Sequence, residues 1–226
     1  MELSPRLFKI ASLVPKGARI ADVGTDHGYI PLYLFENKII SSAIAMDVNS
    51  MPLKRAEVNL TQAGFDTNCD FRLSDGLEKL NPDEADVIVI AGMGGILMQD
   101  ILKRGKNVIT PKTKLILQPM IAPIELRTFL YENGFDIENE YVVREENKFY
   151  NIMCVSLGQY EPLSRDLIIG KNLKINSADV FDDYISYRIK VCTNIVNGIE
   201  KSKNPDLAEL KKQKNYLEVL VGSQKE

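Results

Sequence analysis

The sequence predicts an α/β protein: a mostly parallel sheet that ends in an antiparallel hairpin, followed by two long helices. Three observations support this prediction. Short apolar runs alternate with helix-like segments as far as Gly134, which is the order expected of a parallel sheet. Two β-rich segments then follow with only a short polar stretch between them, as in an antiparallel hairpin. Beyond Gln159, apolar residues recur at helical spacings, which indicates a pair of packed helices.

Length and composition limit the possibilities. The chain has 226 residues, of which 45% are hydrophobic and 26% are charged. This length fits one full-size domain of ~100–150 residues with a smaller one attached, and we place the domains at residues 1–158 and 159–226. The composition excludes disordered, collagen-like and disulfide-scaffold proteins. The net charge of −3 excludes a surface that is basic throughout, so any nucleic-acid contact must be a local patch.

Cysteine usage and apolar runs exclude further classes. Cys69, Cys154 and Cys192 lie far apart in the chain, so we expect neither structural zinc nor a disulfide framework, and no other metal. No apolar run approaches the ~18 residues that span a membrane. The first residues also lack the basic and apolar parts of a signal peptide. We therefore expect a cytoplasmic protein with no membrane partner.

The elements of the sheet can be predicted in order. Ser4 and Pro5 suit the start of a first helix over residues 5–13. Parallel strands are predicted at residues 19–23, 43–47, 70–74, 86–91 and 114–118, with helices at 31–37, 52–63 and 123–133. Gly64 and Gly134 end the last two helices. The fourth and fifth strands are nearly all apolar, which is typical of strands buried on both faces.

The end of the chain departs from a plain dinucleotide-binding domain, which would continue with another crossover helix. Residues 135–144 and 149–157 instead predict an antiparallel hairpin. In the tail, the apolar positions of the first predicted helix are Ile185, Cys192, Ile195 and Ile199, and those of the second are Leu207, Leu210, Leu217 and Val221. Lys214 interrupts the second set, and the segment 202–205 between the sets has the composition of a turn. We therefore predict two long antiparallel helices.

The loop from Asp22 to Gly28 lies where a strand ends and a helix begins. Glycine at such a point lets the backbone pass close to a ligand, and a helix N-terminus offers unpaired amides. Pyrophosphate-binding loops have the pattern G-x-G-x-x-G, whereas this loop carries carboxylates at Asp22 and Asp26. These would repel a pyrophosphate and suit a cation. A ligand with an amino group and a sulfonium centre fits better than NAD, although a strand-to-helix turn without a ligand remains an alternative.

Two further acids follow strands of the predicted sheet. Asp47 ends the second strand, 19 residues after Gly28, where an acid accepts hydrogen bonds from ribose hydroxyls. Asp75 follows the third strand, just before Gly76, and could accept from an adenine amino group. Each acid alone could be a helix cap or a solvated strand end. Together with the loop they define one crevice, because the carboxyl ends of parallel strands meet at one edge of the sheet.

A second glycine-rich segment, Ala91-Gly92-Met93-Gly94-Gly95, follows the fourth strand. The three glycines remove side chains next to the predicted crevice and leave room for a flat substrate. The alternative is a tight strand-to-helix turn without chemistry. We favour the approach surface, because three glycines exceed what a turn requires.

Several segments together form a more specific pattern. They are Asp22-Val-Gly-Thr-Asp-His-Gly-Tyr-Ile-Pro, Asp75-Gly-Leu, Ala91-Gly-Met-Gly-Gly, Leu117-Gln-Pro, Leu126-Arg127, and the stretch from Glu145 to Phe149-Tyr150. In these segments the chain resembles the bacterial tRNA (adenine-22-N1)-methyltransferase family, densely over residues 1–157 and loosely in the tail. The resemblance implies a Rossmann-like class I methyltransferase dependent on S-adenosylmethionine (SAM), with a seven-stranded sheet and a C-terminal coiled-coil domain. It also implies a tRNA substrate that is methylated at adenine N1.

The same resemblance implies roles for individual residues. The implied cofactor-binding residues are Asp22, Gly24, Thr25, Asp26, His27, Gly28, Asp47, Val48, Asp75, Gly76, Ala91 and Gly92. The implied residues at the reacting groups are Asp26, Gly92, Met93 and Gly94. Asp47 corresponds to the family's ribose acid and Asp75 to its adenine acid.

The implied chemistry makes modest demands on the protein. Adenine N1 carries a lone pair at neutral pH, so the enzyme mainly aligns donor and acceptor in a dry pocket. A group that accepts a hydrogen bond from N6 would help, and Asp26 and the Gly92 carbonyl are candidates. His27, the single histidine, is more often a structural hydrogen-bonding residue in such a loop than a chemical one. For Tyr29, packing is favoured over stacking on a base.

Two other functions remain open at this point. One is a SAM-dependent enzyme for a small molecule, in which the tail would serve oligomerisation. The other is a non-catalytic nucleotide-sensing module. Six lysines of the tail could contact RNA phosphates, although exposed helix lysines usually serve only solvation. They are Lys190, Lys201, Lys203, Lys211, Lys212 and Lys214.

Overall fold

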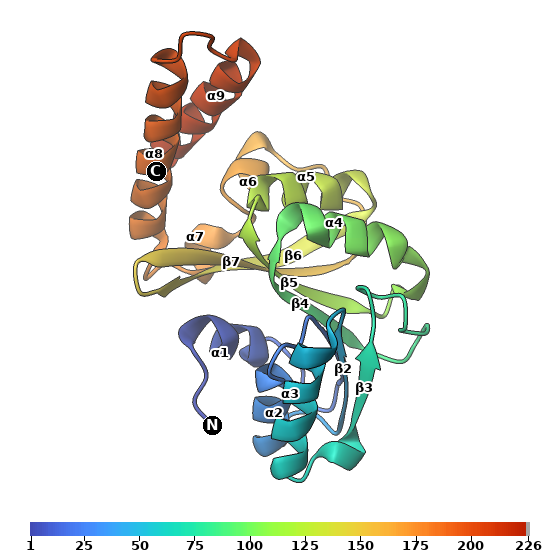
Figure 1. Ribbon diagram of the computed structural model, residues 1–226. Helices are drawn as coiled ribbons and strands as arrows, with labels where there is room; N and C mark the ends of the chain where they lie inside the picture. The colour runs from blue at the N-terminus through green and yellow to red at the C-terminus, as the bar shows by residue number, and fades with distance from the viewer. Residues whose placement is uncertain (225–226) are drawn as a thin grey trace.

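The computed structural model describes residues 1–224 and has a seven-stranded sheet at its centre (Figure 1). The strands are β1 (Arg19–Val23), β2 (Ser42–Asp47), β3 (Cys69–Leu73), β4 (Val87–Gly94), β5 (Lys114–Ile121), β6 (Phe135–Glu145) and β7 (Lys148–Leu157). They lie in the order β3-β2-β1-β4-β5-β7-β6. The strands β1 to β5 are parallel, and β7 is antiparallel to both of its neighbours. The strand order reverses between β1 and β4, so a crevice is expected beyond the carboxyl ends of these two strands.

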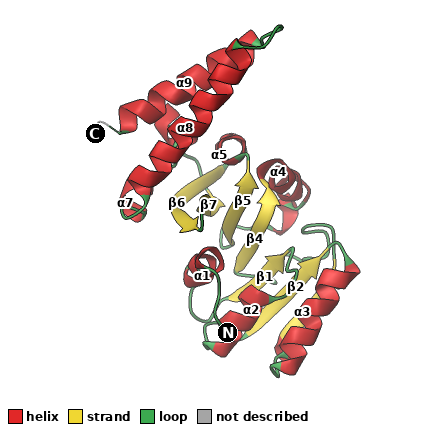
Figure 2. Ribbon diagram, turned by 60° about the vertical axis from the view of Figure 1, so that its left-hand side comes forward, coloured by secondary structure: helices red, strands yellow, loops and turns green. Residues whose placement is uncertain are grey.

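Helices cover both faces of this sheet (Figure 2). One face carries α1 (Pro5–Ser12), α2 (Tyr29–Glu36) and α3 (Ser50–Gln62), and the other carries α4 (Gly95–Arg104) and α5 (Pro123–Glu132). Two short 3-10 helices, Asp66–Asn68 and Lys106–Val108, precede β3 and β5. Side chains of β4 enter the two cores alternately: Val87 and Val89 on the first face, Ile88 and Ile90 on the second. Burial on both faces explains why this strand is apolar throughout.

The predicted fold class and the order of the strands along the chain are confirmed. The predicted and observed strands differ at their ends. Both β4 and β5 extend beyond their predicted ends, because their pairing continues past Ala91 through two register shifts. Helix α2 begins at Tyr29, since Gly28 in the left-handed conformation (φ 68°) precedes its first turn. The sequence analysis did not assign α4 or two short helices, α6 (Ser164–Ile168) and α7 (Leu173–Asn176). Helices of four or five residues show too little periodicity to be predicted.

The tail forms the predicted pair of antiparallel helices, α8 (Phe181–Glu200) and α9 (Leu207–Ser223), which project from the sheet domain (Figure 2). Two contacts show that α8 and α9 run antiparallel. Cys192 Sγ lies 3.1 Å from the carbonyl oxygen of Gln213, and Gln224 Nε2 donates to Ser186 Oγ at 2.9 Å. A residue early in α8 therefore meets a residue late in α9.

The residues inside this helical hairpin differ in part from those predicted. Ile185 and Cys192 are buried as expected. Val196, however, is buried in place of Ile195, which is 40% exposed. In α9, Leu220 is buried instead of Val221, and Leu207 at its start is exposed. The sequence pattern was misassigned because α8 carries apolar residues on two faces, and the spacing alone did not separate them.

The second apolar face of α8 consists of Tyr187, Val191 and Ile195. These residues are four apart, so they lie in one row along the helix. All three are exposed, by 41%, 37% and 40%. They form an apolar stripe that no residue of α9 covers completely.

A buried ion pair joins the sheet domain to the segment that leads into the helical hairpin. Arg127 of α5 and Glu140 of β6 are completely buried, and Arg127 Nε donates to Glu140 Oε2 at 3.0 Å. Arg127 Nη1 also donates to the carbonyl oxygen of Leu167 in α6 at 3.0 Å. Asn151 Nδ2 donates to Glu140 Oε1 at 3.1 Å, and the hydroxyl of Tyr184 in α8 donates to Asn151 Oδ1 at 3.2 Å. The hydrogen bonds thus run without interruption from α5 into α8.

The boundary at residue 158 stays a prediction. Beyond it, Ile168, Ile169 and Leu173 are buried in the same cluster as Val142 of β6. The chain from 159 to 180 therefore packs on the sheet domain before the long helices begin. Residues 225–226 of the predicted second domain lie outside the described residues.

Candidate functional site

A cavity of about 350 Å³ lies beyond the carboxyl ends of β1 and β4. Its lining comes from the loop after β1, the end of β4, the first turn of α1 and the end of β5. The lining residues are Arg6, Leu7, Asp22, Gly24, Thr25, Asp26, His27, Tyr29, Ile30, Ala91, Gly92 and Met120. The structure thus brings together the loop acids and the first part of the second glycine segment, as predicted. We call this cavity the crevice.

The loop after β1 owes its shape to glycines and to bonds with β2. Gly24 and Gly28 have φ values of 76° and 68°, in the left-handed region that favours glycine. The amides of Gly24 and Thr25 donate to the carbonyl oxygen of Met46 at 2.8 and 3.0 Å, and the Gly28 amide donates to Thr25. These amides are used inside the protein, so the loop offers a ligand fewer free donors than the sequence suggested. Its distinctive contribution is therefore its carboxylates.

Asp22 is the buried carboxylate of the crevice, with 4% of its surface exposed. Burial raises the pKa of Asp22 to about 6; the Thr25 hydroxyl opposes this shift, and the neighbouring Asp47 adds to it. Among the described residues, no lysine or arginine pairs with Asp22. A buried carboxylate without a cation is costly. The crevice therefore suits a ligand that brings a positive charge of its own.

The next predicted acids lie at the ends of β2 and β3. Asp47 is buried, and its Oδ1 accepts a hydrogen bond from the Asn49 amide at 2.8 Å. Asp75 is exposed and forms a two-bond ion pair with Arg104 of α4, at 2.9 and 2.8 Å. Arg104 lowers the pKa of Asp75 through these bonds. Neither acid lines the crevice itself, and the neighbouring Val48 and Gly76 do not line it either.

Asp26 and His27 lie at the open side of the loop. The Asp26 carboxylate lies 3.7 Å from His27 Nε2 and 3.9 Å from Arg55 Nη1 of α3. Asp26 itself has a φ of 44°, which a carboxylate residue tolerates better than most. The His27 ring stacks on Tyr29 with centroids 5.0 Å apart. Tyr29 is 39% exposed and lines the crevice, so it does not pack entirely beneath the loop.

The end of β4 forms the opposite wall of the crevice. Gly92 has a φ of 76°, and its amide donates to Gln118 Oε1 at 3.2 Å. Ala91 lines the crevice with it, but Met93 and Gly94 do not. The Met93 side chain instead extends over Gly24, where a Cβ atom would clash with its terminal carbon. Met93 therefore touches the loop after β1.

Gly94 and Gly95 differ in what the structure requires of them. Gly94 has an ordinary backbone, and a Cβ atom there would make an ordinary contact with Ile121 at 3.6 Å. A Cβ atom at Gly95 would lie 2.5 Å from the carbonyl oxygen of Ala122. Gly95 thus allows the close approach of α4 to the start of α5. Of the three glycines, Gly92 is the one that faces the crevice.

Arg6 is a residue of the crevice that the sequence did not predict. Its Nη1 donates to Gln118 Oε1 at 2.6 Å, and its guanidinium lies over the Tyr150 ring, 5.3 Å from the centroid. Its Nε is buried and has no hydrogen-bond partner among the described residues. Gln118 is fully buried. Nothing in the sequence near Arg6 indicated these contacts, because both partners lie more than 110 positions away in the chain.

Within residues 1–224, no group of three or more His, Cys, Asp or Glu side chains is arranged to hold a metal ion. None of the helices in this range is both long and apolar enough to cross a membrane.

Known proteins similar to this chain agree with the geometry. Residues 3–153 match the family described as a methyltransferase domain. A tRNA (adenine(22)-N(1))-methyltransferase of Bacillus subtilis is 35% identical over 187 residues, which are 80% of this chain and 79% of that protein.

Solved structures resemble the chain over almost its whole length. The crystal structure of the B. subtilis m1A22 tRNA methyltransferase has a TM-score of 0.88 at 32% identity and covers 99% of each chain. A Streptococcus pneumoniae structure in complex with S-adenosyl-L-methionine has a TM-score of 0.84 at 31% identity, covering 99% of this chain and 100% of that one. The carboxylate-lined crevice at the strand switch point, the hairpin that closes the sheet and these similarities lead to one conclusion: the chain belongs to the methyltransferase family that includes the tRNA (adenine(22)-N(1))-methyltransferases.

Proposed function

We propose that this protein transfers the methyl group of SAM to N1 of adenine 22 in tRNA. The observation that carries the proposal is the crevice itself. Asp22, a buried carboxylate with no basic partner among residues 1–224, lines it on the β1 side, and Gly92, without a side chain, lines it on the β4 side. The relatives named for this reaction, and the relative solved with SAM, support the same cofactor and substrate.

The residues present fit SAM as the cofactor. Asp22 would accept a hydrogen bond from the cofactor's ammonium group. The carboxylate would thereby gain a positively charged partner. Gly24, with its left-handed backbone, leaves room for the cofactor to pass. Asp47 would accept from the ribose hydroxyls with the oxygen that Asn49 does not use. When bound, SAM supplies an electrophilic methyl group on a positively charged sulfur.

Asp75 would bind the adenine amino group only through the side of its carboxylate that Arg104 does not occupy. Its two oxygens are held by Arg104 in the structure. Each carboxylate oxygen can accept more than one hydrogen bond, so the ion pair does not prevent such a contact. Arg104 instead fixes the position of the Asp75 carboxylate.

The β4 wall would receive the target base. Adenine N1 already carries its lone pair, so the protein has no proton to remove before methylation. The Gly92 carbonyl or Asp26 would accept a hydrogen bond from N6 and stabilise the positive charge that develops on the ring. Gln118, held by Arg6 and by the Gly92 amide, keeps this part of the backbone in place. Alignment and exclusion of water then account for most of the catalysis.

One assay tests the proposal. The purified protein is incubated with methyl-labelled SAM and unmodified bacterial tRNA transcripts, and transfer of the label is measured. Label should enter transcripts with adenine at position 22 and not the same transcripts with guanine there. Transfer to small molecules but not to tRNA would favour a small-molecule enzyme. SAM binding without any transfer would favour a sensing module.

We further propose that the protein acts in the cytoplasm, where tRNA is available, and that it needs no metal. Addition of a chelator to the same assay should leave the rate unchanged. Loss of activity that is restored by a divalent ion would contradict this part of the proposal.

A further inference from the structure

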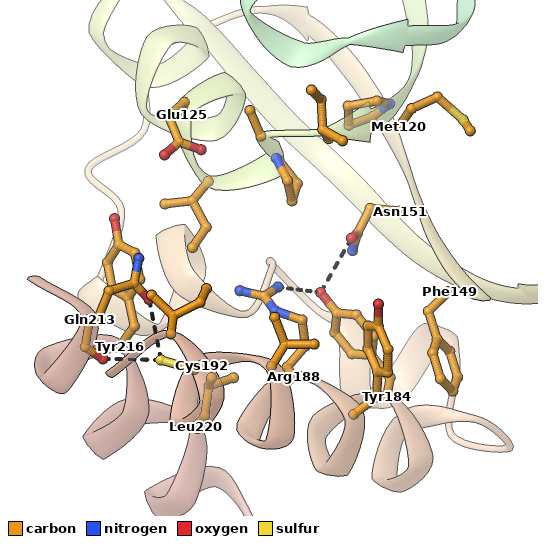
Figure 3. A pocket seen from close by; sticks show the side chains of 18 residues that line it. Met120, Glu125, Phe149, Asn151, Tyr184, Arg188, Cys192, Gln213, Tyr216 and Leu220 are labelled. Carbon is orange, nitrogen blue, oxygen red and sulfur yellow. Dashed lines mark hydrogen bonds between the residues drawn. The ribbon is translucent and has the colours of Figure 1, made fainter. Parts of the chain in front are cut away.

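A second cavity of about 560 Å³ lies between the sheet domain and the helical hairpin (Figure 3). One side comes from the end of β5, the start of α5 and β7, and the other from α8 and α9. We call it the interdomain groove. Its volume is within the range of ~300–1,000 Å³ typical of ligand sites.

The interdomain groove adjoins the crevice. Met120, at the end of β5, lines both cavities. Its Sδ lies 3.7 Å from Nε2 of Gln118, the residue that also holds Gly92 and Arg6. A polymer whose reacting unit enters the crevice would thus meet the groove with a neighbouring unit.

The walls of the groove are unusually apolar for an exposed surface. The stripe of Tyr187, Val191 and Ile195 lines it from α8, and Ile121, 69% exposed, lines it from β5. Contiguous exposed apolar surface of this kind marks interaction sites. Phe149 and Tyr187 are in ring contact, with centroids 5.4 Å apart. They offer aromatic surface to a flat ligand.

The charge of the groove favours a negatively charged ligand. Its lining contains two side chains that are charged at neutral pH, Glu125 and Arg188, and they have opposite signs. Glu125 is already paired with Lys212 of α9 at 3.4 Å. Arg188 has no carboxylate partner within ion-pair distance among the described residues, and its Nη1 donates to the neutral Tyr184 hydroxyl at 2.7 Å. Arg188 therefore has no direct ion pair, and of the described carboxylates the buried Glu140 interacts with its charge only through space.

This lack of a carboxylate partner is uncommon among the arginines of the protein. Arg19, Arg55, Arg72, Arg104, Arg127 and Arg144 each lie within 4.0 Å of a carboxylate. Within residues 1–224, Arg6 and Arg188 have no such partner, and they line the crevice and the groove respectively. Two guanidinium groups of this kind in adjoining cavities suit successive phosphates of a nucleic-acid backbone.

The Arg188 side chain is held in place by Tyr184 of the same helix. Figure 3 shows it beside Tyr184, which in turn reaches Asn151. Asn151 is bonded to Glu140 of the buried ion pair. The guanidinium is therefore anchored at one end, and its other nitrogens remain available. A donor positioned in this way loses little entropy on binding a phosphate.

We propose that the interdomain groove binds an unpaired nucleotide of the RNA substrate next to the one that enters the crevice. Its base stacks on the aromatic surface of Phe149 and Tyr187, and Arg188 binds its phosphate. RNA is recognised in this way where bases are splayed out of the helix. The inference rests on the proposed function for the identity of the RNA, but the groove contact can be tested separately.

The test is binding of unmodified tRNA transcript, with S-adenosylhomocysteine present so that no reaction occurs. Tyr187→Leu keeps the apolar character but removes the ring, so tRNA affinity should fall roughly 5- to 150-fold, the range for loss of one stacked base. Tyr187→Phe keeps the ring and should bind nearly as wild type. Arg188→Ala should weaken binding and reduce the slope of log affinity against log salt by about one. Arg19→Ala, at the amino end of β1, is the matched control.

The outcomes separate the inference from the proposed function. Weaker tRNA binding by Tyr187→Leu and Arg188→Ala, with S-adenosylhomocysteine affinity and melting temperature unchanged, supports the groove even if no methyl transfer occurs. Wild-type tRNA affinity in both variants overturns the inference, even if methylation of adenine 22 persists. If Tyr187→Leu and Tyr187→Phe weaken binding equally, the groove does not stack a base. Absence of tRNA binding by the unaltered protein overturns both.

Discussion

Arg6 and Gln118, 112 positions apart in the chain, are joined by a hydrogen bond of 2.6 Å from Arg6 Nη1 to Gln118 Oε1. The same oxygen accepts from the Gly92 amide, and Gln118 Nε2 donates to the Pro119 carbonyl at 2.9 Å. One glutamine thus connects helix α1, the end of β4 and the end of β5. The wall of the crevice that would face the target base depends on this side chain.

The first prediction concerns the stability of this connection. Arg6→Ala removes a charged hydrogen bond and leaves the buried Gln118 oxygen with one donor, so the free energy of unfolding should fall by about 1–3 kcal/mol. Urea denaturation measures the change. Arg19→Ala, which breaks an ion pair at the protein surface, should have a much smaller effect. Equal effects of the two substitutions would contradict the Arg6–Gln118 contact.

A second prediction follows from the pKa of Asp22, which burial raises to about 6. A cationic cofactor requires the ionised carboxylate, so SAM affinity should rise by up to tenfold per pH unit below pH 6 and level off above it. The stability of the free protein changes in the opposite direction. The folded state holds the Asp22 proton more tightly than the unfolded state, so the free energy of unfolding falls as the pH rises to about 6. Calorimetry between pH 5 and 7 measures the first effect, and thermal melting the second.

The control for this titration is Asp22→Asn. It should melt higher than wild type at pH 7 without SAM, since no buried charge remains, and its weak SAM affinity should not vary over this pH range. A pH dependence that persists in Asp22→Asn would assign the titration to another group.

The third prediction compares the acids at the ends of β2 and β3. Asp47→Ala should weaken SAM binding by about 1.5–3 kcal/mol, as expected for loss of a charged hydrogen-bond acceptor. Asp75→Ala should weaken it less, because Asp75 is exposed and shares its oxygens with Arg104. Calorimetry on both variants decides the order. The reverse order would place the cofactor nearer to β3 than we propose.

The fourth prediction concerns the glycine segment after β4. Gly92→Ala should strongly reduce methyl transfer, because the left-handed backbone at this position disfavours a side chain and the residue faces the crevice. Gly94→Ala is the matched control and should be nearly neutral, since its Cβ atom would make an ordinary contact with Ile121. Steady-state kinetics with tRNA compares the two. Equal losses would mean that the segment acts as a whole and not through Gly92.

The fifth prediction concerns Asp26. If its charge steers the sulfonium or holds N6 of the base, Asp26→Asn should lower kcat by ~10²-fold with little change in the KM for tRNA. The substitution preserves size, so folding and SAM binding serve as controls. Wild-type kcat at saturating SAM would leave Asp26 only a role in shaping the loop, together with its contacts to His27 and Arg55.

The parts of the site that the sequence predicted share a physical basis. Asp22, Gly24 and Gly92 lie at the carboxyl ends of β1 and β4, and the carboxyl ends of parallel strands meet at one edge of the sheet. Their proximity therefore follows once the strands are recognised. The contact between Arg6 and Gln118 follows from no such rule, because a side chain of a surface helix such as α1 can reach many positions. Contacts of this kind depend on tertiary packing.

The same limit explains the helical hairpin. The sequence correctly predicted two antiparallel helices, but it assigned Ile195 to their interior, and the structure exposes this residue. Apolar residues that line a groove and apolar residues that pack in a core recur at the same helical spacing. Only the position of the neighbouring domain distinguishes them, and that position is set by Arg127 and Glu140, far away in the sequence.

The buried ion pair has a mechanical consequence. A hinge requires backbone that can rotate without breaking buried bonds, whereas here Arg127 is bonded both to Glu140 and to the segment that leads into α8. Breaking such a pair costs several kcal/mol, typically ~3–5. Helix α8 has 20 residues and so extends roughly 30 Å at a rise of about 1.5 Å per residue. The buried bonds therefore hold the base of α8 at a set angle to the sheet, and its far end lies roughly 30 Å from that base.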